Sequence, residues 1–160
     1  MGTLLGSAVE ASVRIARDLR PPILDHGFVD ALEWQARDFQ KRTGIRCRFA
    51  ASDESLELEP NAAVAVFRIV QELLTNITKH AKAKEVNISL ATTPVTVQLE
   101  VIDDGIGIAA KDRGKRDSFG LRGMIERARE FDGELVIAPG PGGGTRAVLT
   151  LPRATLREDA

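Results

Sequence analysis

Apolar residues recur at steps of three and four along residues 61–82. They are Ala63, Val66, Phe67, Val70, Leu73, Leu74 and Ile77. This spacing predicts a helix with one apolar face, and Asn61 is a candidate for its N-cap. Helices are also expected over residues 8–20 and from about Val29 to Lys41. The first would stop at Pro21 and Pro22, since proline disfavours helical geometry before it, and the second at Gly44.

Alternating apolar and polar residues predict strands with one buried face in other parts of the chain. The segments with this period of two are 45–50, 86–90, 95–101, 134–138 and 145–151. Thr93-Pro94 breaks the pattern and suggests a hairpin. Residues 121–131 read as one more helix. Ten of the 14 glycines fall between Gly105 and Gly144, so this region is expected to contain the tight turns.

The predicted order is helix, helix, strand, long helix, two strands, glycine-rich loop, helix and two strands. Such an order fits an α/β fold, a two-layer α/β sandwich whose mixed, largely antiparallel sheet has helices packed on one face. The regular β-α-β-α alternation of a doubly wound fold does not occur.

Composition narrows the functional classes. Hydrophobic residues make up 43% and charged residues 28% of the chain, as in an ordinary globular domain. The formal net charge of −1 argues against nucleic-acid binding. Cys47 is the single cysteine, which excludes a disulfide framework and a multi-cysteine metal site. The sequence shows no apolar run of the roughly 20 residues that span a bilayer, and Met1 to Ser7 lacks signal-peptide features.

Polar side chains line one edge of the long predicted helix. Glu72 and Asn76 are one turn apart, and Lys79 and His80 follow after another turn. A carboxylate and an amide beside the apolar face would reach a ligand lying along the helix, and such oxygen ligands suit Mg²⁺. Taken alone, the stripe is more simply explained as a solvated helix face.

One glycine motif follows a predicted strand, and another precedes a predicted helix. Asp103-Asp104-Gly105-Ile106-Gly107 comes directly after a strand, where an aspartate would accept a hydrogen bond from an exocyclic amine such as that of adenine; an acidic turn is an equally good explanation. Its spacing matches neither a P-loop nor a dinucleotide fingerprint. Ser118 to Met124 places glycines at a helix start, where unpaired amides bind anions, unless it is a simple loop-to-helix junction.

A fourth segment, Gly142 to Thr145, leads into the last predicted strand and on its own is a flexible hairpin turn. Together and in this order, the four segments resemble the ATPase domain of histidine kinases. Residues 71–81 look like the N box, Asp103-x-Gly105-x-Gly107 like the G1 box and Phe119 to Met124 like the G2 region. Gly143-Gly144-Thr145 with Leu151-Pro152 looks like the closing motif.

The superfamily, called GHKL, also contains DNA gyrase B, MutL and heat-shock chaperones, and its nucleotide fold is called the Bergerat fold. The match favours the kinases paired with nitrate-response-type regulators, because residues 16–27, 31–45 and 120–130 have close relatives there. The resemblance extends from Arg14 to Pro152.

The resemblance implies roles for the polar stripe at the phosphate end of ATP. Asn76 would ligate the Mg²⁺ that bridges the phosphates. Glu72 would act as base or orient the attacking imidazole, and Lys79 and His80 would face the phosphates. The charged stretch Lys111 to Asp117 would form a lid over the nucleotide or, equally, a solvated loop.

It also implies roles at the adenine end. Asp103 would read the adenine amine, Gly105 and Gly107 would shape the pocket, and Thr145 would support the base. The residues that would offer backbone amides to the phosphates are Gly120, Leu121 and Gly123.

A histidine kinase needs an acceptor histidine, and neither His26 nor His80 has the acceptor context. The expected organisation is therefore a remnant of the second dimerisation-hairpin helix with cloning-junction residues (1–20), the ATP-binding catalytic domain (21–153) and a frayed tail (154–160). Without the first hairpin helix, the fragment would bind ATP but not phosphorylate itself.

The expected partners are the dimerisation and phosphoacceptor helix of the parent kinase and the receiver domain of a response regulator. The full-length protein would be a homodimer. It would be located in the cytoplasm, or it would be a membrane-bound sensor with this domain in its cytoplasmic portion. The competing interpretations are a serine kinase of the anti-sigma-factor type and an ATP-dependent interaction module without catalysis.

Overall fold

A computed structural model describes residues 19–107 and 120–156. Five strands form one mixed sheet in the order β1-β2-β3-β5-β4. The strands are β1 (Arg46–Ala51), β2 (Glu85–Thr92), β3 (Thr96–Asp103), β4 (Glu134–Pro139) and β5 (Thr145–Pro152). Only β1 and β2 pair in parallel; the other neighbours are antiparallel. This confirms the predicted mixed, largely antiparallel sheet.

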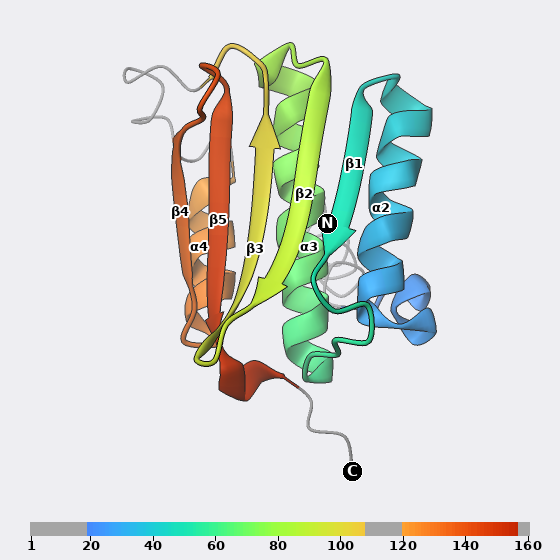
Figure 1. Ribbon diagram of the computed structural model, residues 1–160, viewed down its shortest axis with the longest axis vertical. Coiled ribbons are helices and arrows are strands. Elements are labelled where there is room, and N and C mark those ends of the chain that lie inside the picture. Colours follow the sequence, from blue (N-terminus) through green and yellow to red (C-terminus); the bar gives the residue numbers. More distant parts are fainter. Residues whose placement is uncertain (1–18, 108–119, 157–160) are drawn as a thin grey trace, which may run out of the picture.

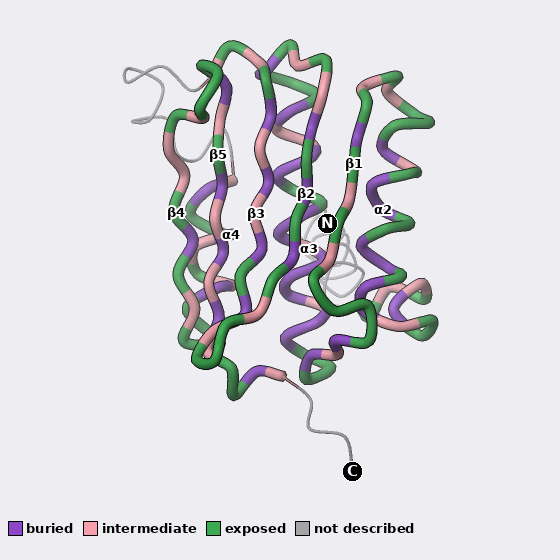
Figure 2. Tube along the Cα trace, in the orientation of Figure 1, coloured by how far each residue is buried: buried purple, intermediate pink, exposed green. Residues whose placement is uncertain are grey.

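Three helices lie on one side of this sheet (Figure 1). They are α2 (Phe28–Thr43), α3 (Pro60–Asn76) and α4 (Leu121–Arg129). Strands alternate between buried and exposed residues, and the apolar faces of the helices are buried (Figure 2). The two-layer α/β sandwich is therefore confirmed. None of the helices in the described part of the chain is long and apolar enough to cross a membrane.

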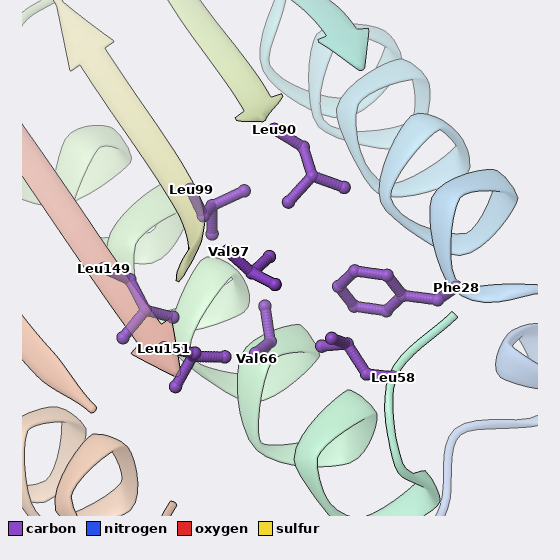
Figure 3. Close-up of a pocket in the computed structure, with 8 residues that line it drawn as sticks. All are labelled: Phe28, Leu58, Val66, Leu90, Val97, Leu99, Leu149 and Leu151. Carbon is purple, nitrogen blue, oxygen red and sulfur yellow. The ribbon is translucent and has the colours of Figure 1, made fainter. Parts of the chain in front are cut away.

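The core lies between the sheet and α3, and it is tightly filled. Val66 of α3 meets Phe28 at the start of α2 and the inward residues of three strands around a small gap (Figure 3). The gap has no room for a water molecule. Packing of this density makes the interior sensitive to the loss of even one methylene group.

The N-terminal region differs from expectation where it is described. The predicted helix over residues 8–20 lies mostly outside the described residues, and Leu19 and Arg20 at its end are not helical. Pro22–His26 forms a 3₁₀ turn, η1, before Gly27 (φ 109°) leads into α2. Rigid φ angles at the two prolines favour such a turn over continuation of a helix.

The long helix also differs from its predicted form at both ends. Asn61 is not its N-cap: Glu59 holds that position, no side chain caps the helix, and Pro60 supplies the fixed φ suited to a first turn. At the other end the α-helix stops at Asn76, and Ile77–Ala81 continues as a π-helical turn, η2. Lys82 then adopts a left-handed conformation (φ 50°) and ends the helix.

Thr155 and Leu156, at the start of the predicted frayed tail, contact the rest of the domain. Arg153–Thr155 forms a 3₁₀ turn, η4, and Thr155 is buried. Its carbonyl accepts a hydrogen bond from the backbone amide of Glu59 (2.8 Å), and Leu156 forms a β-bridge with Leu58. Both contacts involve residues about 100 positions earlier, so the polar composition of the tail gave no indication of them.

Candidate functional site

The last turn of α3 carries the polar stripe seen in the sequence. The adjacent face of the helix, including Ile69, Val70, Leu73 and Leu74, is buried in the core. Glu72 is exposed and Asn76 is half-buried, so both lie at the border between the core and solvent. Lys79 and His80 are exposed on η2. Single π-helical turns are rare and are often found at functional sites.

Asp103 is the last residue of β3, and its side chain is only 5% exposed. Its Oδ1 accepts the backbone N–H of Gly105 at 2.8 Å. Burial raises the pKa of this carboxyl, while backbone hydrogen bonds from Gly105 and Thr145 oppose the rise and the neighbouring Asp104 charge adds to it. A buried aspartate at a strand end, held by two amides, has a fixed orientation.

The glycine motif after β3 touches the end of the long helix. Ile106 donates its backbone N–H to the carbonyl oxygen of Ala81, at 2.8 Å. A Cβ atom added at Gly105 would lie 2.2 Å from that same oxygen. Because no side chain fits such a distance, glycine at this position allows the loop to lie directly against η2.

The same motif also touches the glycine turn before β5. A Cβ atom at Gly144 would lie 1.9 Å from the carbonyl oxygen of Asp103, and one at Gly107 (φ 74°) would lie 2.6 Å from the oxygen of Gly143. Thr145, the first residue of β5, donates its amide to Asp103. The three motifs are therefore joined by backbone contacts.

The remaining motif, at the start of α4, lies against α3. Gly120 precedes α4 in a left-handed conformation (φ 63°), and a Cβ atom there would lie 3.5 Å from Cδ and Oε1 of Glu72. The Glu72 carboxylate thus lies near the start of α4, where helix amides favour negative charge. Leu121 is buried, whereas Gly123 is exposed with nothing within 4 Å of an added Cβ.

The structure therefore brings the described parts of all four motifs together at one end of α3. Lys111 to Asp117, Ser118 and Phe119 lie outside the described residues. Three contributors were missing from the predicted site: Ala81, Asp104 and Gly144. Gly144 could have been suspected from the run of three glycines before β5. Ala81 contributes its backbone carbonyl and Asp104 its carboxylate, and both contacts depend on tertiary structure.

The chemistry of these residues suits a nucleotide. The buried Asp103 offers an acceptor, and the glycine contacts leave no side chain between the loop and η2. Within residues 19–107 and 120–156, no three His, Cys, Asp or Glu side chains are grouped to hold a metal ion. An ion beside Asn76 would therefore depend on phosphate and water for most of its ligands, which is the usual coordination of Mg²⁺.

Comparison with known families settles the relationship. Residues 61–155 match the family described as histidine kinase-, DNA gyrase B- and HSP90-like ATPases. That segment covers more than half of the chain and contains the described parts of all four motifs. The chain belongs to this ATPase family.

Within the ATPase family, the relatives of this chain include sensor kinases, as the sequence motifs predicted. DegS of Brevibacillus brevis, a signal transduction histidine-protein kinase/phosphatase, is 34% identical over 143 residues, which are 89% of this chain and 37% of DegS. The sensor histidine kinase MctS of Rhizobium johnstonii is 33% identical over 156 residues, 96% of this chain and 34% of MctS. The chain thus spans about a third of the length of these relatives.

A solved structure supports the fold. The ATP-binding domain of PrrB from Mycobacterium tuberculosis superposes with a TM-score of 0.66 at 22% identity, over 78% of this chain and 92% of that domain. At this level of identity the agreement concerns the fold alone.

Proposed function

We propose that this ATPase domain binds Mg²⁺ and ATP, and supplies the γ-phosphate for a histidine on a dimerisation helix that is not among the described residues. The observation that carries the proposal is the position of Asp103. Its buried carboxylate lies where the backbones of η2, the glycine loop and the start of β5 meet. A carboxylate held in this way would accept a hydrogen bond from the adenine amine of ATP.

The phosphate end of the nucleotide would lie along the end of α3. Asn76 would bind Mg²⁺ together with the phosphates, and the ion would neutralise charge as the phosphoryl group leaves. Lys79 and His80 on η2 would face the phosphates, as would the amides of Gly120, Leu121 and Gly123. The exposed carboxylate of Glu72, beside Gly120, would orient the imidazole of the acceptor or take its proton.

In the full-length protein, we propose a homodimer that passes the phosphoryl group on to an aspartate in the receiver domain of a response regulator. The names of the relatives support a sensor kinase. A domain that uses ATP would work in the cytoplasm, where ATP is available.

Asp103→Asn tests the adenine assignment. A hydrogen bond to a charged group contributes about 1.5–3 kcal/mol, so ATP affinity should fall roughly ten- to a hundredfold. Isothermal titration calorimetry with and without Mg²⁺ measures the change. Asp53→Asn is the matched control, because Asp53 is exposed in the loop between β1 and α3. If Asp103→Asn binds ATP as tightly as the parent, Asp103 does not read adenine.

Transfer is tested by adding the kinase's dimerisation hairpin, with its acceptor histidine, to this chain and radiolabelled ATP. Label on the hairpin that is released by acid identifies phosphohistidine. Acid-stable label would indicate a serine kinase, and ATP binding without transfer would indicate an interaction module. Glu72→Gln should slow transfer while leaving ATP affinity unchanged.

A further inference from the structure

Asp104, next to the buried Asp103, has a separate set of contacts. Its Oδ1 accepts the backbone N–H groups of Lys84 (2.8 Å) and Glu85 (3.0 Å) at the start of β2. Its own N–H donates to the carbonyl oxygen of Glu85 (3.2 Å). Hydrogen bonds from Glu85 and then Lys84 lower the pKa of Asp104, so the carboxylate is charged near neutral pH.

These contacts join the same two segments as the bond from Ile106 to Ala81. One segment runs from the end of η2 through the left-handed Lys82 into β2. The other is the glycine loop after β3. With the Asp104 carboxylate in place, the short turn between η2 and β2 is fixed at both of its ends.

We propose that Asp104 is a positioning residue for the nucleotide site, which fixes the spacing between Asp103 and the helix end that carries Asn76, Lys79 and His80. This inference rests on the proposed function, because those residues would bind opposite ends of one ATP molecule. A ligand that must contact both groups at once binds best at one separation of them, since small misplacements of binding groups greatly reduce their combined effect.

The experiment compares three substitutions at Asp104 by calorimetry with Mg²⁺ and ATP. Asp104→Ala removes the acceptor, and ATP affinity should fall about tenfold. Asp104→Asn keeps an oxygen at the same position and should remain within about twofold of the parent. Asp104→Glu keeps the charge but lengthens the side chain, so it should behave like Asp104→Ala and also provides a second variant if the alanine protein fails to fold.

Asp53→Ala is the matched control. Asp53 is also exposed, and its Oδ1 also accepts two hydrogen bonds, both from Ser55, but these stay within one loop. It should leave ATP affinity unchanged. Amide hydrogen exchange by NMR reports the contacts directly: the Lys84, Glu85 and Ile106 amides should exchange faster in Asp104→Ala than in Asp104→Asn.

The outcomes separate the two proposals. If the parent chain does not bind ATP, the proposed function fails. If the parent binds ATP and Asp104→Ala binds equally well, the positioning role is wrong. Weak binding by Asp104→Asn, equal to that of Asp104→Ala, would also overturn it, because charge rather than the hydrogen-bond acceptor would then matter.

Discussion

Gly144 provides the sharpest test of how the site is assembled. A Cβ atom at this position would lie 1.9 Å from the carbonyl oxygen of Asp103, 2.7 Å from its carbonyl carbon and 3.0 Å from Oδ1. Carbon and oxygen normally approach no closer than about 3.3 Å, so Gly144→Ala requires β3 and β5 to separate by roughly 1.4 Å at this point. The clash is with backbone, which cannot rotate away.

The expected effects of Gly144→Ala follow from that displacement. Overpacking of a well-packed site costs about 1–3 kcal/mol, and a backbone clash belongs at the upper end. For a chain of this length, a loss of about 2–3 kcal/mol lowers the melting temperature by roughly 4–12 °C. Since the amide of Thr145 also moves away from Asp103, ATP affinity should fall by up to about a hundredfold.

Gly142→Ala in the same turn is the matched control. Nothing lies within 4 Å of a Cβ atom there, and the residue has no positive φ. It should be neutral or stabilise the fold by up to about 1 kcal/mol, because alanine restricts the unfolded chain. Circular dichroism melts and calorimetry with ATP measure both variants. A Gly144→Ala protein that melts and binds ATP like the Gly142→Ala protein would refute the close approach of β5 to Asp103.

Three further predictions concern other parts of the molecule. Burial raises the pKa of Asp103, so its contribution to stability is fully present below the ordinary aspartate value and is lost as pH rises through the raised value. Asp103→Asn should therefore gain stability relative to the parent in thermal melts as pH rises above the ordinary aspartate pKa of about 4, and a difference that stays constant with pH would contradict this. Phe28→Ala should cost about 3–5 kcal/mol in urea unfolding because Phe28, the first residue of α2, is 1% exposed. ATP affinity should be unchanged, since α2 begins at the opposite end of the sheet from the end of β3 (Figure 1). Burial raises the pKa of the Cys47 thiol to about 11, so a thiol reagent at neutral pH should label it only in denaturant, and rapid native labelling would contradict its burial.

Local patterns predicted most of the fold because helices and strands bury one face. Apolar periods of 3.6 and two residues predicted the three helices and five strands that the structure describes. The predicted and observed elements differ only at their ends. The sequence did not predict the change to a π-helical turn at Ile77, since the apolar spacing continues through that point. Nor did it predict that Thr155 is buried, because its contact with Glu59 is formed by residues far apart along the chain.

The candidate site was predicted through its motifs rather than through physics alone. Each motif had an ordinary structural explanation, and their order carried the interpretation. What the motifs could not reveal is which backbone groups touch. Asp104 resembled a solvated acidic residue of a turn until the structure showed its oxygen bonded to Lys84 and Glu85.

The parallel pairing of β1 with β2 affects how short a working version of this protein can be. The family match begins at residue 61, after β1 and after Phe28. A chain trimmed to that match would lose the six paired positions from Arg46 to Ala51 and leave β2 as a bare strand edge, a site for aggregation. It would also remove Phe28 and Leu58, and so uncover Val66 and Leu90, which line the same small gap (Figure 3). A soluble minimal domain should therefore start no later than η1.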